Sequence, residues 1–175
     1  MTMALMSILL LTGKAFGQVE EKEPAAIIEI GGAGQWALNH GKPSYGPNFA
    51  VEVTPIKEWL EIEAGVTPFF SHGQTEWDTD LLFKKPYTLS GTAEFMFGIG
   101  PEWAHTSSGG QSTNSVAAEA ALDFMFWPAP KRKFGWYIEP SYGYSFAKDH
   151  QQSMSVSVGL LIACGKRHST DGSRD

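Results

Sequence analysis

Residues 153–160 read SMSVSVGL, so small or polar residues alternate with apolar ones without exception. Successive side chains of a β-strand point to opposite faces, and a period of two therefore indicates a strand. One face of this strand would carry serine and glycine, and the other would carry methionine, valine and leucine. A sheet built from such strands separates two environments of different polarity.

The same alternation recurs along the chain and predicts an all-β protein. Gly, Pro, Asn and Ser gather between the alternating segments, for example in residues 39–47, 55–58 and 107–114, where we expect turns. Strands joined in sequence make an antiparallel up-and-down meander, and closing it removes the unpaired edges of the sheet. We therefore predict a closed antiparallel up-and-down β-barrel of about eight strands. The eight segments cover residues 28–38, 48–54, 60–67, 76–84, 93–103, 115–126, 136–146 and 153–162.

The ends of the chain differ from this pattern. Residues 4–11 form an apolar run too short to span a bilayer, and Ala15-Phe16-Gly17 is a small-x-small cleavage pattern. Cys164 is the only cysteine, so no intrachain disulfide is expected. The predicted organisation is a signal peptide at 1–17, an N-terminal segment at 18–25, a barrel domain at 26–163 and a polar C-terminal tail at 164–175.

Charge and hydropathy exclude several classes of function. The net charge of −6 and the pI near 5.3 argue against nucleic acid as a partner, because no basic stripe is present to neutralise phosphates. After the predicted signal peptide, no stretch reaches the roughly 18 continuous apolar residues that a transmembrane helix needs. If the protein crosses a membrane, it must do so with strands.

Alternation alone does not say which face of the sheet points inward. A soluble lipocalin-like barrel would keep its apolar face inside and bind an apolar ligand there. In this chain, however, Gly, Ala and Ser dominate the polar face and fit the narrow lumen of an eight-stranded barrel. Phe, Trp, Ile, Leu and Val dominate the other face and suit lipid. A transmembrane barrel is therefore favoured, with a girdle of aromatic residues near the strand ends formed by Trp36, Trp77, Trp103, Trp127 and Trp136.

Besides the alternating pattern, two segments carry a resemblance to a known family: FGIGPEW at 97–103 and IEPSYGYSF at 138–146. With the eight alternating segments, they resemble the small outer-membrane β-barrels of the OmpA/OmpX type over roughly residues 26–163. The resemblance implies the outer membrane of a Gram-negative bacterium, outer-membrane lipid as a partner, and a periplasmic segment at 18–25. The turns holding Ile56-Lys57, Lys85-Pro86 and 130–133 would then face the periplasm.

On this placement, four histidines lie in loops on the outer side: His40, His72, His105 and His150. Neutral imidazoles can bind transition metals. Loops collect polar residues in general, however, and no two of these histidines have the close spacing of a metal-binding pair. We therefore predict neither a metal site nor a cofactor.

The face assigned to the lumen is acidic, and Lys84 is its one clear cation. Unpaired buried carboxylates are costly, so either the lumen holds water or some of the acids are neutral. A wet acidic lumen would attract cations as partners and would suit a small channel. A water-containing interior that conducts nothing is the competing interpretation. The predicted lumen acids are Glu29, Glu52, Glu61, Glu63, Glu94, Glu102, Glu119, Asp123 and Glu139.

An esterase is an alternative to a barrel without catalytic activity. His105-Thr106-Ser107, followed by Glu119, resembles the motif of the lipid A 3-O-deacylases. The resemblance implies Ser107 as nucleophile, His105 as base and Glu119 as the acid that orients the histidine. The sequence as a whole favours a non-enzymatic outer-membrane barrel with a structural, interaction or small-pore role.

Overall fold

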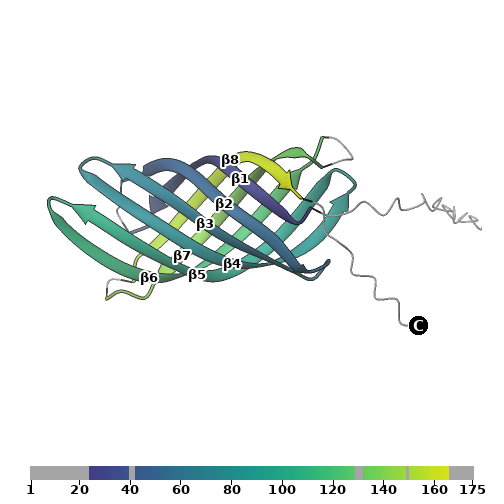
Figure 1. The fold of residues 1–175 in the computed structure, drawn as a ribbon. Coiled ribbons are helices and arrows are strands. Elements are labelled where there is room, and N and C mark those ends of the chain that lie inside the picture. The colour runs from purple at the N-terminus through teal and green to yellow at the C-terminus, as the bar shows by residue number, and fades with distance from the viewer. Residues whose placement is uncertain (1–23, 40–41, 129–131, 149, 166–175) are drawn as a thin grey trace, which may run out of the picture.

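The computed structural model describes residues 24–39, 42–128, 132–148 and 150–165, and it is a closed barrel of eight antiparallel strands (Figure 1). Each strand pairs with its neighbours in sequence, and β1 pairs with β8 to close the sheet. This architecture confirms the predicted fold class. The predicted signal peptide at 1–17 lies outside the described residues. The strands are β1 (Ala26–Ala37), β2 (Ser44–Ile56), β3 (Leu60–Ser71), β4 (Gln74–Ser90), β5 (Ala93–Ser108), β6 (Gln111–Phe126), β7 (Phe134–Ser145) and β8 (Gln152–Cys164).

The chain enters and leaves the barrel at the same end, because Ala26 at the start of β1 pairs with Cys164 at the end of β8. We call this the terminal end. The opposite end holds the turns that follow β1, β3, β5 and β7, and we call it the loop end. No helix in the described part of the chain is long and apolar enough to span a membrane.

The strands are longer than the alternation predicted, and the turns are correspondingly shorter. Residues 107–114, expected to form a turn, are mostly strand: only Gly109 and Gly110 separate β5 from β6. Both glycines have positive φ angles, 57° and 81°, as a two-residue type I′ hairpin turn requires. The expected turn at 39–47 likewise ends where β2 begins at Ser44. The Ser- and Thr-rich hairpin is polar on both faces, so its strands show no alternation of hydrophobicity.

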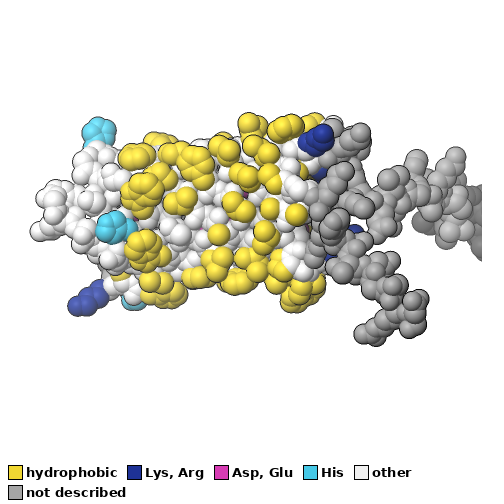
Figure 2. Space-filling view, viewed as in Figure 1, with side chains coloured by type: hydrophobic (Ala, Val, Ile, Leu, Met, Phe, Trp, Pro, Cys, Tyr) yellow, Lys and Arg dark blue, Asp and Glu magenta, His cyan; other side chains and the backbone are white. Residues whose placement is uncertain are grey.

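The outer wall of the barrel is apolar. Figure 2 shows hydrophobic side chains spread along the body of the barrel, with histidines near the loop end. The wall includes Ile99, Val158 and Leu160, which are 55%, 50% and 63% exposed. Side chains of this size facing outward overturn the soluble lipocalin-like alternative, because that barrel would enclose them. They form instead the apolar band that a transmembrane barrel presents to lipid.

One predicted member of the aromatic girdle is wrongly placed. Trp36, Trp77, Trp103 and Trp136 are exposed on the outer wall, but Trp127 is 1% exposed and points into the barrel. Its indole N–H donates to Glu94 Oε2 at 3.3 Å. Trp127 directly follows β6 and has the same parity as the inward-facing Asp123 and Met125, so the alternation of the strand already indicates an inward side chain.

The terminal end of the barrel is filled by an apolar cluster, here called the basal plug. Tyr137 crosses this region, and its hydroxyl donates to Asn48 Oδ1 at 2.6 Å, while Asn48 Nδ2 donates to Thr67 Oγ1 at 2.9 Å. These bonds tie β7 to β2 and β3 across the lumen. The plug consists of Ile27, Met96, Met125, Trp127, Tyr137 and Leu161.

Two glycines of neighbouring strands leave room for the Tyr137 side chain. Gly31 and Gly159 are opposite one another on β1 and β8, and Gly159 is also opposite Tyr137. A Cβ atom on Gly31 would lie 2.2 Å from the Val158 carbonyl oxygen and 2.8 Å from the Tyr137 hydroxyl. The missing side chains therefore leave the space in which the tyrosine ring lies.

Gly31→Ala should lower the free energy of unfolding by about 1–3 kcal/mol, the usual cost of overpacking. Gly32→Ala is the matched control, because the nearest atom to its Cβ is 3.7 Å away. Urea unfolding of the folded barrel in phospholipid vesicles measures both. Equal stabilities for the two variants would contradict this account of the glycine pair.

Candidate functional site

The lumen contains a buried ion cluster around Lys84 of β4. Its Nζ lies 3.0 Å from Asp123 Oδ2, 2.6 Å from Glu139 Oε2 and 3.8 Å from Glu52 Oε2, and it also donates to Glu63. The Lys84 side chain is fully buried. The acids come from β2, β3, β6 and β7, so one ammonium group connects strands from opposite sides of the barrel.

The path of the Lys84 side chain depends on Gly98. The two residues are opposite each other on β4 and β5, and a Cβ on Gly98 would lie 2.8 Å from Lys84 Cγ. The aliphatic stem therefore runs across the glycine and carries the ammonium group toward the barrel axis.

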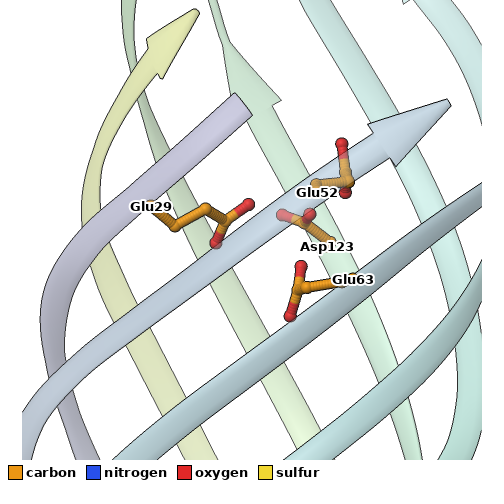
Figure 3. Close-up of side chains that lie close together, drawn as sticks. All are labelled: Glu29, Glu52, Glu63 and Asp123. Atoms are coloured by element: carbon orange, nitrogen blue, oxygen red, sulfur yellow. The ribbon is translucent and has the colours of Figure 1, made fainter. Parts of the chain in front are cut away.

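The carboxylates of the cluster outnumber its cation. Figure 3 shows Glu29, Glu52, Glu63 and Asp123 converging inside the barrel, each from a different strand. One oxygen from each lies within 4.8 Å of the others, a spacing that could hold a metal ion. Lys84 already supplies a positive charge to three of these four acids. Glu29 Oε1, both Glu52 carboxylate oxygens and Asp123 Oδ1 are buried and have no hydrogen-bond partner among the described residues.

A second group of acids lies closer to the loop end: Asp78, Asp80, Glu102 and Glu119, which we call the upper acids. They line a small cavity of about 30 Å³ together with Gln35 and with Glu63 and Glu139, the two acids that also pair with Lys84. Asp80 and Glu102 are directly opposite each other on β4 and β5.

Above the upper acids, the lumen widens into a polar cavity of about 380 Å³, here called the vestibule. Its lining includes Asn39, His72 and Gln151, which belong to turns at the loop end. Gln35, Phe69, Glu102, Gly143 and Ser153 line both cavities, so the two are contiguous. From the loop end inward, the lumen thus passes from vestibule to upper acids, then to the Lys84 cluster and the basal plug.

The sequence-predicted lumen acids fall into two classes of burial. Glu61, Glu94 and Glu102 are half-buried, and Glu94 accepts a hydrogen bond from Arg132 at 2.5 Å. The buried members are Glu29, Glu52, Glu63, Glu119, Asp123 and Glu139.

Sequence reasoning left Asp78 and Asp80 out of the set of candidate lumen acids. Both occupy inward positions of β4, and Asp78 is buried. The sequence signal for an inward direction was the alternation in β4. Asp78 and Asp80 are two residues apart, and each is next to an outward-facing residue, Trp77 or Leu81. The convergence of four carboxylates on Lys84 had no sequence signal, because it depends on contacts between distant strands.

The structure does not bring the residues of the deacylase-like motif together. His105 and Ser107 occupy outward positions of β5, whereas Glu119 is buried on the lumen side of β6. Glu119 is opposite Gly100, five residues before His105 along β5. His105 Nδ1 instead contacts Asn114 Oδ1 at 2.7 Å, and its ring stacks on Trp103. The acid and the histidine therefore lie on opposite sides of the barrel wall.

The other loop histidines are dispersed. His72 lies in the turn after β3, and the His150 ring stacks on Tyr144 with ring centroids 5.8 Å apart. His40 lies outside the described residues.

No family model and no curated protein matches the chain. Solved structures do. Neisserial surface protein A (NspA) matches with a TM-score of 0.63 at 10% identity, covering 79% of this chain and 95% of NspA. The attachment invasion locus protein Ail of Yersinia pestis matches with a TM-score of 0.53 at 17% identity, covering 80% of this chain and 98% of Ail.

The N-terminal β-barrel domain of Pseudomonas aeruginosa OprF matches with a TM-score of 0.55 at 12% identity, covering 78% of this chain and 97% of that domain. These likenesses concern the fold, and they extend over nearly the whole of each matched structure. They agree with the apolar outer wall, which suits lipid. In fold, the chain is similar to these small eight-stranded outer-membrane β-barrels.

Proposed function

We propose that this protein is a non-conducting outer-membrane barrel with a structural or interaction role, which presents its vestibule and loop end to the outside. The observation that carries the proposal is the filled lumen. The basal plug contains Met125, Trp127 and Leu161, all at most 1% exposed, and the Lys84 cluster lies above it. A conducting path needs a continuous polar space, and close-packed apolar side chains provide none.

The small-pore interpretation fits this arrangement less well. The vestibule is open, but the cavity beneath it has a volume of only about 30 Å³. Passage further inward would require the Lys84 ion pairs to open and the basal plug to separate. Interaction at the loop end requires neither change.

Recording across a planar lipid bilayer tests the proposal. The full chain is folded in detergent, its closed barrel is verified by heat-modifiable migration on a gel, and it is inserted at low protein density. We expect no steady single-channel conductance in 1 M KCl. The control is the double variant Met96→Ala and Leu161→Ala, which removes bulk from the basal plug and should raise the frequency of transient openings.

Reproducible conductance steps of the wild-type protein, scaling with the number of inserted barrels, would overturn the proposal and restore the small pore. A silent wild type alongside a variant with openings would support it, because the same preparation would then be shown to insert and to report conduction.

A further inference from the structure

The vestibule is a polar cavity that the barrel leaves open at its loop end. Its volume of about 380 Å³ falls within the range of roughly 300–1,000 Å³ in which proteins bind small molecules. We propose that the vestibule binds a small neutral saccharide, which enters from the loop end. This inference deepens the proposed interaction role and rests on it for the side of the membrane from which the ligand comes.

The inward side chains become smaller toward the loop end, and this change creates the vestibule. Strands β5 to β8 contribute large side chains to the basal plug: Met96, Met125, Tyr137 and Leu161. Nearer the loop end, the same strands contribute small residues to the vestibule lining: Ala104, Ala117, Gly143 and Ser153. Side chains can fill the interior of an eight-stranded barrel, as they do at the terminal end. The width of the barrel therefore does not require this cavity, and the choice of inward residues leaves it open.

Gly143 keeps two polar groups accessible at the base of the vestibule. It is opposite Ser153 on β8, and a Cβ atom on Gly143 would lie 2.6 Å from Ser153 Oγ and 3.6 Å from Glu102 Oε2. Any larger residue would crowd the serine hydroxyl and the carboxylate. The glycine thus leaves a hydroxyl and an acid beside the space that a ligand would occupy.

Amide side chains make up much of the vestibule lining. Gln35 is already engaged, because it accepts a hydrogen bond from Ser44 and donates one to Asp78. The side chains of the other four make no hydrogen bond to another residue that the structure describes. Each amide offers two N–H donors and a carbonyl acceptor, and a sugar hydroxyl both donates and accepts. The five amides are Gln35, Asn39, Gln74, Gln151 and Gln152.

The charges in and below the vestibule exclude two other classes of ligand. Glu76 and Glu102 line it, and the remaining upper acids lie beneath it, so an anionic ligand would be repelled. An apolar ligand would displace water from the amides and hydroxyls without replacing the lost hydrogen bonds. A ligand with neutral hydroxyl groups suffers neither penalty.

The mixture of donors and acceptors separates a saccharide from an organic cation. An ammonium ligand has donors alone and would satisfy only the carboxylates and carbonyl oxygens. The amide N–H groups and the Lys42 ammonium, which also lines the vestibule, would remain without acceptors. A saccharide presents several groups that donate and accept, so it can satisfy both kinds of lining group at once.

Ligand-observed NMR tests the proposal with the full chain folded in phosphatidylcholine nanodiscs, which contain neither lipopolysaccharide nor glycoside detergent. The probes are the neutral disaccharides maltose, lactose and chitobiose. We expect at least one of them to show saturable magnetisation transfer, with a dissociation constant on the order of 1 mM or below. Empty nanodiscs should show none.

Filling the vestibule should abolish this binding. Ala104→Phe places a ring in the cavity, because Ala104 is 7% exposed and lines it. Ala64→Phe is the matched control, since Ala64 is exposed on the outer wall opposite Val51 and Leu81. It should bind the disaccharide like the wild type. Heat-modifiable migration verifies that each variant is folded.

A second pair of variants tests the amides without filling the cavity. Gln152→Met keeps the bulk of the first residue of β8 and should weaken binding about two- to tenfold, the effect of losing one hydrogen bond. Gln111→Met is the control, because Gln111 is the first residue of β6 at the same end of the barrel and does not line the vestibule. It should leave the dissociation constant unchanged.

Three outcomes would overturn the inference. The first is no saturable binding of any of the three neutral probes, and the second is unchanged binding by Ala104→Phe. The third is tighter binding of spermidine or of a sulfated heparin disaccharide than of every neutral probe, which would assign the vestibule to a charged ligand. The conductance recording is independent of all three, so the two proposals can fail separately.

Discussion

Replacing Lys84 with methionine should lower the free energy of unfolding by about 3–5 kcal/mol, the usual cost of removing one partner from a buried ion pair. Lys84 is fully buried and contacts Glu52, Glu63, Asp123 and Glu139. Methionine keeps most of the apolar stem that crosses Gly98, so the loss would report the missing charge. Urea unfolding in phospholipid vesicles, followed by tryptophan fluorescence, measures it.

Lys85→Met is the matched control. Its ammonium group is exposed, donates to the Glu58 carbonyl oxygen at 2.6 Å and lies 5.9 Å from the centre of the Tyr87 ring. Removing such an exposed charge costs about 0–1 kcal/mol. The same substitution at adjacent positions therefore separates the buried cluster from a general effect of lysine loss.

A second set of variants identifies the cause of the expected loss. If unpaired carboxylates destabilise Lys84→Met, then adding Glu63→Gln and Glu139→Gln should restore much of the lost stability, because these acids no longer require a cation. A Lys84→Met barrel as stable as the wild type would mean that the carboxylates are neutral in the folded protein and that the ion pairs contribute nothing.

The outer wall was predictable from sequence, and much of the interior arrangement was not. Alternation is a local property: in residues 153–160 each side chain follows from its neighbours, and the strand, its faces and the closed sheet follow in turn. The Lys84 cluster joins residues that are 21, 39 and 55 positions apart. Its formation depends on the register of several strand pairs, which the hydrophobic pattern leaves open.

The sequence interpretation differs from the structure at a hairpin whose two faces carry similar residues and at a tryptophan just beyond a strand end. The hairpin around Gly109 and Gly110 is polar on both sides, so the alternation predicts a turn over residues 107–114 where the structure has strand ends. Trp127 lies just beyond the end of β6, and a tryptophan near a strand end was assigned to the girdle. In the hairpin the pattern carries no information about direction, whereas Trp127 continues the inward alternation of Asp123 and Met125, so the pattern indicates its direction correctly.

Ile99→Arg should lower the free energy of unfolding by about 2–4 kcal/mol in a phospholipid bilayer, the cost of an arginine facing lipid near the midplane. Ile99 is 55% exposed on the outer wall and lies near the middle of β5. In water, an arginine at so exposed a position would cost little, because its charge would stay hydrated. The substitution therefore measures the environment of the wall and not the packing of the barrel.

Leu89→Arg is the control, because Leu89 is 61% exposed and lies one residue before the end of β4 at the terminal end of the barrel. An arginine near the membrane interface costs about 0–1 kcal/mol, since its charge reaches water and headgroups. The difference between the two variants should persist when both are unfolded by urea in vesicles of the same lipid. Equal and small losses would mean that water surrounds the middle of the wall. That result would remove the bilayer from the explanation of this fold, because the apolar side chains of the outer wall would then be exposed to solvent without any partner to bury them.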